Sequence, residues 1–147
     1  MYKGLQCRVC LVRECSPTVG KKTIITAAED IYDLVKEDIA YSDREIFTSV
    51  MLSTKNEVVG VETVSIGTLN STLITPREVF KSAILSNANA IIVCHNHPSG
   101  SLEPSAEDRK ITRKLVSAGN LLAIEVIDHL IISSKGFCSF QDKGIML

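Results

Sequence analysis

The segment AIIVCHNHPSG, from Ala90 to Gly100, is the strongest indication of the fold. Its first five residues, 90–94, are a short and wholly apolar run, which is typical of a central strand covered on both faces. The run passes directly into HNHPSG, in which proline, serine and glycine favour a turn. We therefore expect a central strand that ends at an exposed edge, where α/β proteins commonly hold their functional sites.

Helix signals flank this strand on both sides. Three capping patterns mark helix starts: Thr26-Ala-Ala-Glu29, Thr75-Pro76-Arg77-Glu78 and Ser105-Ala-Glu-Asp108. The first helix is expected to run to about Lys36, and the third to end at the stop signal Gly119-Asn120. In the second helix the expected buried stripe is Val79, Ala83 and Ile84.

Strand signals alternate with these helices. We expect further strands over 5–15, 44–53, 57–66, 122–127 and 129–133, with a turn at Lys55-Asn56. Strands interleaved with helices predict an α/β fold, a mixed β-sheet flanked by helices. The length of 147 residues predicts one domain, 1–147, in which 1–25 form an N-terminal extension or an edge strand.

Composition narrows the function class. The formal net charge is −1, so the chain has no overall basic excess of the kind that binds nucleic acid. We see no signal peptide and no membrane span, which predicts a cytoplasmic protein with reduced thiols and no membrane partner. On a strand Cys7 and Cys10 would face opposite ways, so we interpret this pair as incidental, and Cys94 as a core residue.

The candidate metal ligands are His95, His97 and Asp108. Strand side chains alternate, so both imidazoles project to the same side. Asp108 stands in the first turn of the third helix, where the positive helix end favours an ionised carboxylate. Two histidines and a carboxylate are a catalytic zinc set with one position open for water. The sequence therefore predicts a zinc site that activates water for hydrolysis.

Each of these residues alone has an ordinary interpretation. A His-x-His pair is commonly a polar strand edge, Asp108 fits a capping carboxylate, and Ser105 fits an N-cap. Only the combination favours metal binding, because a strand-end pair and a first-turn aspartate can converge across one short loop.

These residues resemble a known family. His95-Asn-His97-Pro, followed by Ser105-x-x-Asp108, is similar to the JAMM signature of the JAB/MPN metallohydrolases. The chain from about Thr26 onward resembles the RadC-like branch in particular, on the following further motifs: HNHPSG, Arg44-Glu-x-Phe47, Gly67-Thr-Leu-Asn70, Pro76-Arg-Glu78 and Asp128-His129-Leu-Ile-Ile.

The resemblance implies a JAB/MPN-like fold with cytidine-deaminase-like layering, and zinc bound by the two histidines and the aspartate. It also implies Glu45 as general acid/base and Ser105 as oxyanion support. Glu62, in another largely apolar strand, is the competing glutamate. The implied activity is cleavage of a peptide or isopeptide bond in a peptide or protein substrate. The H-x-E and P-C-x-x-C elements of zinc deaminases are absent, which excludes that class.

Two alternatives stay open. The RadC-like branch has been associated with DNA repair, and a local basic cluster offers a nucleic-acid contact: Arg109, Lys110, Arg113 and Lys114. The helix-hairpin-helix segment of many RadC-like proteins does not precede the first helix here, so its role is not carried over. The other alternative is an inactive scaffold. His129 is interpreted as structural or as a support for the site, and the substrate and oligomeric state are left unspecified.

Overall fold

In the computed structural model, residues 9–10, 23–67 and 74–147 are described. Their elements follow in the order α1 (Ala28–Ile39), β1 (Glu45–Leu52), β2 (Val58–Gly67), α2 (Pro76–Leu85), β3 (Ala90–Asn96), α3 (Ala106–Leu122), β4 (Glu125–Ser133) and β5 (Gly136–Ser139). The strands form one sheet in the order β2-β1-β3-β4-β5. Only β3 and β4 are parallel among these neighbours, so the expected mixed α/β sheet is confirmed.

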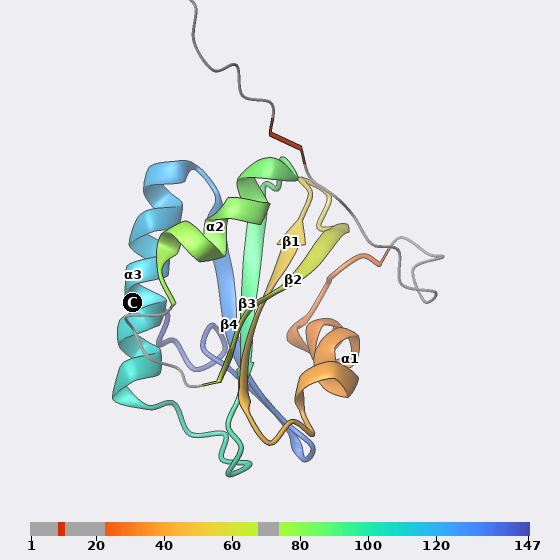
Figure 1. The fold of residues 1–147 in the computed structure, drawn as a ribbon, viewed down its shortest axis with the longest axis vertical. Coiled ribbons are helices and arrows are strands. Elements are labelled where there is room, and N and C mark those ends of the chain that lie inside the picture. The colour runs from red at the N-terminus through yellow and green to blue at the C-terminus, as the bar shows by residue number, and fades with distance from the viewer. Residues whose placement is uncertain (1–8, 11–22, 68–73) are drawn as a thin grey trace, which may run out of the picture.

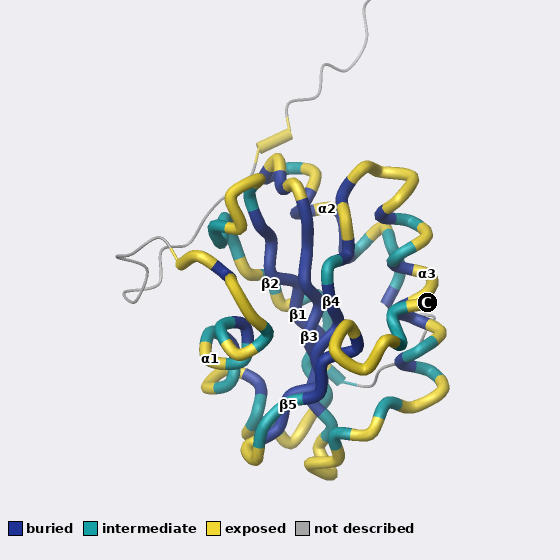
Figure 2. The backbone as a smooth tube through the Cα atoms, turned by 180° about the vertical axis from the view of Figure 1, so that it is seen from behind, coloured by how far each residue is buried: buried dark blue, intermediate teal, exposed yellow. Residues whose placement is uncertain are grey.

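Helices cover both faces of the sheet (Figure 1). On one face, α1 buries Ile31, Val35 and Ile39 in a cluster with residues of β1, β3 and β4. On the other face, α2 and α3 pack over a second cluster that includes Phe47 and Val93. The central strands between these layers are buried along most of their length (Figure 2).

Strand β3 is the centre of the fold, as the apolar run predicts. It is longer than the expected 90–94, because it continues through His95 and Asn96, and all its residues are buried. The expectation of an exposed edge at His95 is wrong, since this residue is 0% exposed. The reason is pairing on both sides, to Phe47 of β1 and Ile131 of β4.

The link from β3 to β4 positions the site. Since the two strands are parallel, α3 must cross back over the sheet between them. Its N-terminal end therefore lies beside the carboxyl end of β3, where the sequence carries HNH. The turn expected after the histidines is present, with the N–H of Gly100 donating to the carbonyl of His97 at 2.8 Å.

The first two helices begin close to the expected positions. The carboxylate that caps α1 is Asp30, not Glu29, because the helix starts at Ala28 and Asp30 accepts from the N–H of Ala27 at 3.0 Å. Thr75 caps α2 as expected. Ile84 does not join Val79 and Ala83 in the core, being 52% exposed on the outer side of a helix that buries only one face.

The predicted end of α3 is also wrong. The helix passes through Gly119 and ends at Leu122, and Ala123 adopts the left-handed conformation with φ of 55°. Gly119 is required for packing, because a Cβ at this position would lie 2.5 Å from the carbonyl oxygen of Ile124 and 3.2 Å from Val126.

We expect Gly119→Ala to destabilise the protein by about 1–3 kcal/mol, the usual cost of forcing an extra carbon into a packed core. The added carbon meets backbone, which cannot move aside as a side chain can. Urea unfolding followed by circular dichroism measures the change. Gly60→Ala is the matched control, since its Cβ would meet only the terminal methyl of Met51. Equal stability of Gly119→Ala and wild type would contradict this packing argument.

The C-terminal strands differ from expectation. The predicted strands 122–127 and 129–133 form one strand, β4, which begins only at Glu125 and has a register shift near Ile127. The short strand β5 was not expected; Gly136, with φ of 143°, allows the hairpin that leads into it. The turn at Lys55-Asn56 is confirmed, whereas the strand predicted over 5–15 lies almost entirely outside the described residues.

Candidate metal centre

Three side chains, from β3, the turn that follows it and α3, meet at the carboxyl end of β3. His95 is the last residue but one of the buried strand, His97 begins the following turn, and Asp108 lies in the first turn of α3. His95 and Asp108 are buried, and His97 retains 13% side-chain exposure. Their ligand atoms all lie within 4.8 Å of one another, so the group could hold a metal ion.

The spacing fits a small tetrahedral ion. The Nε2 atoms of His95 and His97 are 3.0 Å apart. Each Nε2 lies 3.3 Å from an oxygen of Asp108, Oδ1 for His95 and Oδ2 for His97. Ligands at the zinc bond lengths of about 2.0–2.1 Å stand roughly 3.3 Å apart in a tetrahedron. Donor types and distances therefore fit zinc, and one side of the group is reached from solvent through His97.

The electrostatics favour the ligand forms. Burial lowers the pKa of His95, which favours the neutral imidazole that a metal requires. Burial alone would raise the pKa of Asp108, but its interaction with the adjacent His95 imidazole and the hydrogen bonds of Ser105 outweigh this effect. The pKa of Asp108 is held well below its ordinary value, and the carboxylate is ionised at neutral pH.

Local hydrogen bonds fix two of the ligands. The Ser105 hydroxyl accepts from the N–H of Asp108 at 3.1 Å, and the Asp108 carboxylate accepts from the N–H of Ser105 at 2.7 Å. The capping interpretation of both residues is thus correct and compatible with metal binding. His97 Nδ1 lies 2.9 Å from the carbonyl of Ser101 and must donate to it, so in the neutral imidazole Nε2 is the nitrogen with the lone pair that a metal needs.

The two candidate glutamates differ in position. Glu45 is two residues before Phe47 in β1, so both side chains project to one face, and the Phe47 ring stacks on His95 at 6.2 Å. Glu62 lies one strand further out, in β2, and accepts a hydrogen bond from the Ser82 hydroxyl of α2. The structure thus brings Glu45, rather than Glu62, to the strand beside the histidines.

Asn96 joins the strand of the ligands to the strand of Glu45. It is 1% exposed and alternates to the opposite face from the histidines. Its Oδ1 accepts from the N–H of Ile46 at 2.7 Å, and its Nδ2 donates to the carbonyl of Arg44 at 2.9 Å. The backbone on both sides of Glu45 is therefore tied to the residue between the two histidines. The sequence shows only an asparagine between two histidines, and its burial and its contacts with β1 are visible only in the fold.

His129 lies directly behind the site. It is 1% exposed in β4, and its Nε2 is 2.7 Å from Nδ1 of His95. Burial first, and then the charge of His95, lower the pKa of His129 well below its ordinary value. Its other nitrogen meets Thr112 of α3, a residue that the sequence pattern did not identify, because helical spacing marks it only as core.

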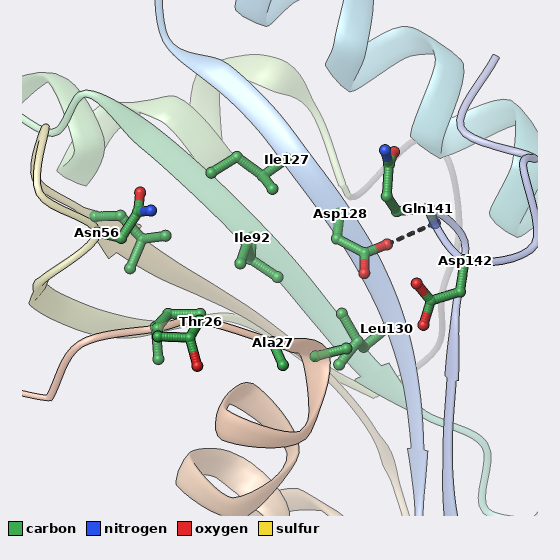
Figure 3. A pocket seen from close by; sticks show the side chains of 12 residues that line it. Thr26, Ala27, Asn56, Ile92, Ile127, Asp128, Leu130, Gln141 and Asp142 are labelled. Atoms are coloured by element: carbon green, nitrogen blue, oxygen red, sulfur yellow. Dashed lines mark hydrogen bonds between the residues drawn. The ribbon is translucent and has the colours of Figure 1, made fainter.

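A cavity of about 230 Å³ lies on the opposite face of the sheet, beside α1 (Figure 3). Asp128 lines it, and its carboxylate accepts from the N–H groups of His129 and Gln141 and from the Ser139 hydroxyl. Burial raises the pKa of Asp128 despite these bonds. The cavity contains none of the candidate ligands and is separate from the metal centre. Cys94, also directed to this face, is a buried core residue as expected.

The basic cluster is on α3, directly after Asp108. Lys110, Arg113 and Lys114 are exposed and Arg109 is partly exposed. None of the four forms an ion pair with another residue of the described ranges. A nucleic-acid contact here stays a prediction. None of the helices in the described part of the chain combines the length and the apolar run that crossing a bilayer requires.

Comparison with known proteins gives the family. A model of the family described as "RadC-like JAB domain" matches residues 25–145. A UPF0758 protein of Desulfitobacterium hafniense is 50% identical over 125 residues, which are 85% of this chain and 55% of that relative. A UPF0758 protein of Moorella thermoacetica is 49% identical over 125 residues, which are 85% of this chain and 55% of that relative. A UPF0758 protein of Bacillus velezensis is 44% identical over 129 residues, which are 88% of this chain and 56% of that relative.

The chain spans about half the length of the curated relatives it matches. The family match covers both histidines, the aspartate and every helix and strand that the structure describes, from residue 25 to residue 145. It agrees with the resemblance seen in the sequence from about Thr26 onward. This chain belongs to the family of RadC-like JAB domains.

Proposed function

We propose that this chain is a zinc-dependent hydrolase of the JAMM type that cleaves a peptide or isopeptide bond. The observation that carries the proposal is the convergence of two imidazole nitrogens and one carboxylate at the spacing of a tetrahedral zinc site. Membership of the JAB family supports it further. His97 is the most exposed of the three, with 13% of its side chain accessible, so a substrate would approach from its side.

In this proposal His95, His97 and Asp108 hold the zinc. When bound, zinc lowers the pKa of a coordinated water and polarises a carbonyl oxygen. Burial of His95 favours its neutral form and the surroundings of Asp108 favour its ionised form, the protonation states that binding requires. No disulfide or large cofactor is needed for this chemistry.

Glu45 acts as the proton carrier. Its carboxylate takes a proton from the attacking water and delivers it to the leaving amine, as a general base and then a general acid. Ser105 supports the carbonyl oxygen as negative charge develops on it. Its oxygen already accepts from the N–H of Asp108, and this leaves its own O–H to donate.

A metal-dependence assay tests the proposed function. The purified chain is loaded with zinc and incubated with two peptide pools, one of linear peptides and one of peptides joined through a lysine side chain. We expect new amino groups to appear in at least one pool, to stop after chelation, and to return when zinc is added. Absence of cleavage in both pools, or cleavage that chelation does not affect, would contradict the proposal.

A further inference from the structure

We propose that His129 and Thr112 are positioning residues that fix the tautomer of His95 through a chain of three hydrogen bonds. The inference rests on the proposed function, because the atom that the chain prepares is the zinc-binding nitrogen of His95. It adds two residues, one on β4 and one further along α3, to a metal centre otherwise built from β3, the turn after it and the start of α3.

The chain consists of three short contacts. Nδ1 of His95 lies 2.7 Å from Nε2 of His129, and Nδ1 of His129 lies 2.6 Å from Oγ1 of Thr112. The Thr112 hydroxyl in turn lies 2.7 Å from the backbone carbonyl of Asp108. This series of hydrogen bonds therefore starts at one candidate ligand, His95, and ends on the backbone of another, Asp108.

The proton positions follow from the last contact backwards. A carbonyl oxygen only accepts, so the Thr112 hydroxyl donates its proton to Asp108. Thr112 must then accept from Nδ1–H of His129, which leaves Nε2 of a neutral His129 as an acceptor. His95 consequently donates from Nδ1, and the lone pair of its Nε2 faces the site. Only this direction satisfies all three contacts and leaves His95 able to bind zinc.

The surroundings hold the chain in one geometry. His95 is 0% exposed, and His129 and Thr112 are each 1% exposed, so bulk water does not compete for these hydrogen bonds. The His129 ring stacks on Phe140 at 4.6 Å and meets Phe47 edge-on at 5.7 Å. These two ring contacts, together with hydrogen bonds at both nitrogens, favour one orientation of the His129 ring.

The tautomer of His95 needs more than one hydrogen bond to be fixed, whereas that of His97 does not. His97 donates directly to a carbonyl, that of Ser101, so its tautomer is set by one contact. His95 faces another histidine, which can act as donor or acceptor at that nitrogen. Without Thr112, His129 could donate from Nε2, and His95 would then carry its proton on the nitrogen that zinc needs. Thr112 removes this competing arrangement.

A matched pair of variants at Thr112 tests the inference. Thr112→Val removes the hydroxyl at nearly constant volume, and Thr112→Ser keeps it. Zinc affinity is measured by competition with a chromogenic chelator. Partners that orient a metal-binding histidine are commonly worth roughly 10- to 100-fold in metal affinity. We expect a loss of at least about tenfold for Thr112→Val and rescue to near the wild-type value by Thr112→Ser.

A spectroscopic measurement tests the same inference in the unchanged protein. Long-range ¹H–¹⁵N correlation spectra of the zinc-loaded wild type distinguish histidine tautomers, and we expect His129 to be neutral with its proton on Nδ1. A proton on Nε2 of His129 would overturn the inference. A purely structural role predicts a lower melting temperature for metal-free Thr112→Val with unchanged zinc affinity, and that result would overturn it too.

The outcomes separate this inference from the function on which it rests. If the wild-type protein binds zinc and Thr112→Val binds it with equal affinity, the positioning role of the hydrogen-bonded residues is overturned, but the proposed function is not. Wild-type protein that binds no zinc overturns the proposed function and the inference with it. Loss in Thr112→Val with rescue in Thr112→Ser supports both.

Discussion

Zinc binding is expected to be lost when either His95 is replaced by alanine or Asp108 by asparagine. Each change removes one of only three protein ligands, so the affinity should fall more than the roughly 100-fold typical of residues that merely support a site. Asp108→Asn keeps an oxygen that can accept from the N–H of Ser105, so helix capping is retained while the charged ligand is lost. Elemental analysis after dialysis, with chelator competition, measures the effect.

Two controls make this result interpretable. Glu62→Gln changes a carboxylate that hydrogen-bonds Ser82 rather than joining the ligand group, so its zinc content should equal that of the wild type. Circular dichroism of the metal-free variants shows whether the fold persists. If folded His95→Ala and Asp108→Asn retain zinc at the wild-type level, the proposed metal centre is wrong.

Glu45→Gln is expected to abolish most hydrolysis without loss of zinc. The amide has nearly the same shape as the carboxylate but cannot take a proton from water. General acid/base groups contribute about 10²–10⁴-fold to rate, so cleavage by this variant should fall within that range. The measurement is the initial rate on whichever peptide pool the wild type cleaves, at equal zinc occupancy.

Glu62→Gln again provides the comparison, because the two glutamates are the alternatives that the sequence leaves open. Glu62 is on β2, separated from β3 by β1, so its variant should retain wild-type rates. Reversed results, with Glu62→Gln inactive and Glu45→Gln active, would exchange the two assignments. Full activity in both variants would remove the general-base role from either residue.

Much of the site is readable from sequence because its signals are local. The apolar run before HNH predicts a buried central strand, and alternation along it directs His95 and His97 to one side. Ser105-x-x-Asp108 predicts the start of α3, and the structure has its capping box there. Both patterns depend on residues at most a few positions apart, which is why they could be interpreted without a fold.

The features that local sequence patterns do not predict depend on tertiary packing. Gly119 is a common helix stop, but here it lets Ile124 pack closely against the helix, and only the three-dimensional contact reveals this. The burial of His95 depends on pairing with β1 and β4, which no local pattern encodes. Thr112 resembles any core residue of a helix until His129 is found beside it. The contact network behind the ligands was therefore beyond sequence reasoning.

The central claim is a single zinc ion held by His95, His97 and Asp108. A crystal of the zinc-loaded chain, with an anomalous difference map recorded at the zinc absorption edge, tests it most directly. We expect one strong peak within about 2.0–2.2 Å of both histidine Nε2 atoms and an Asp108 oxygen. A peak elsewhere in the chain, or no peak at this group in a fully loaded crystal, would contradict it.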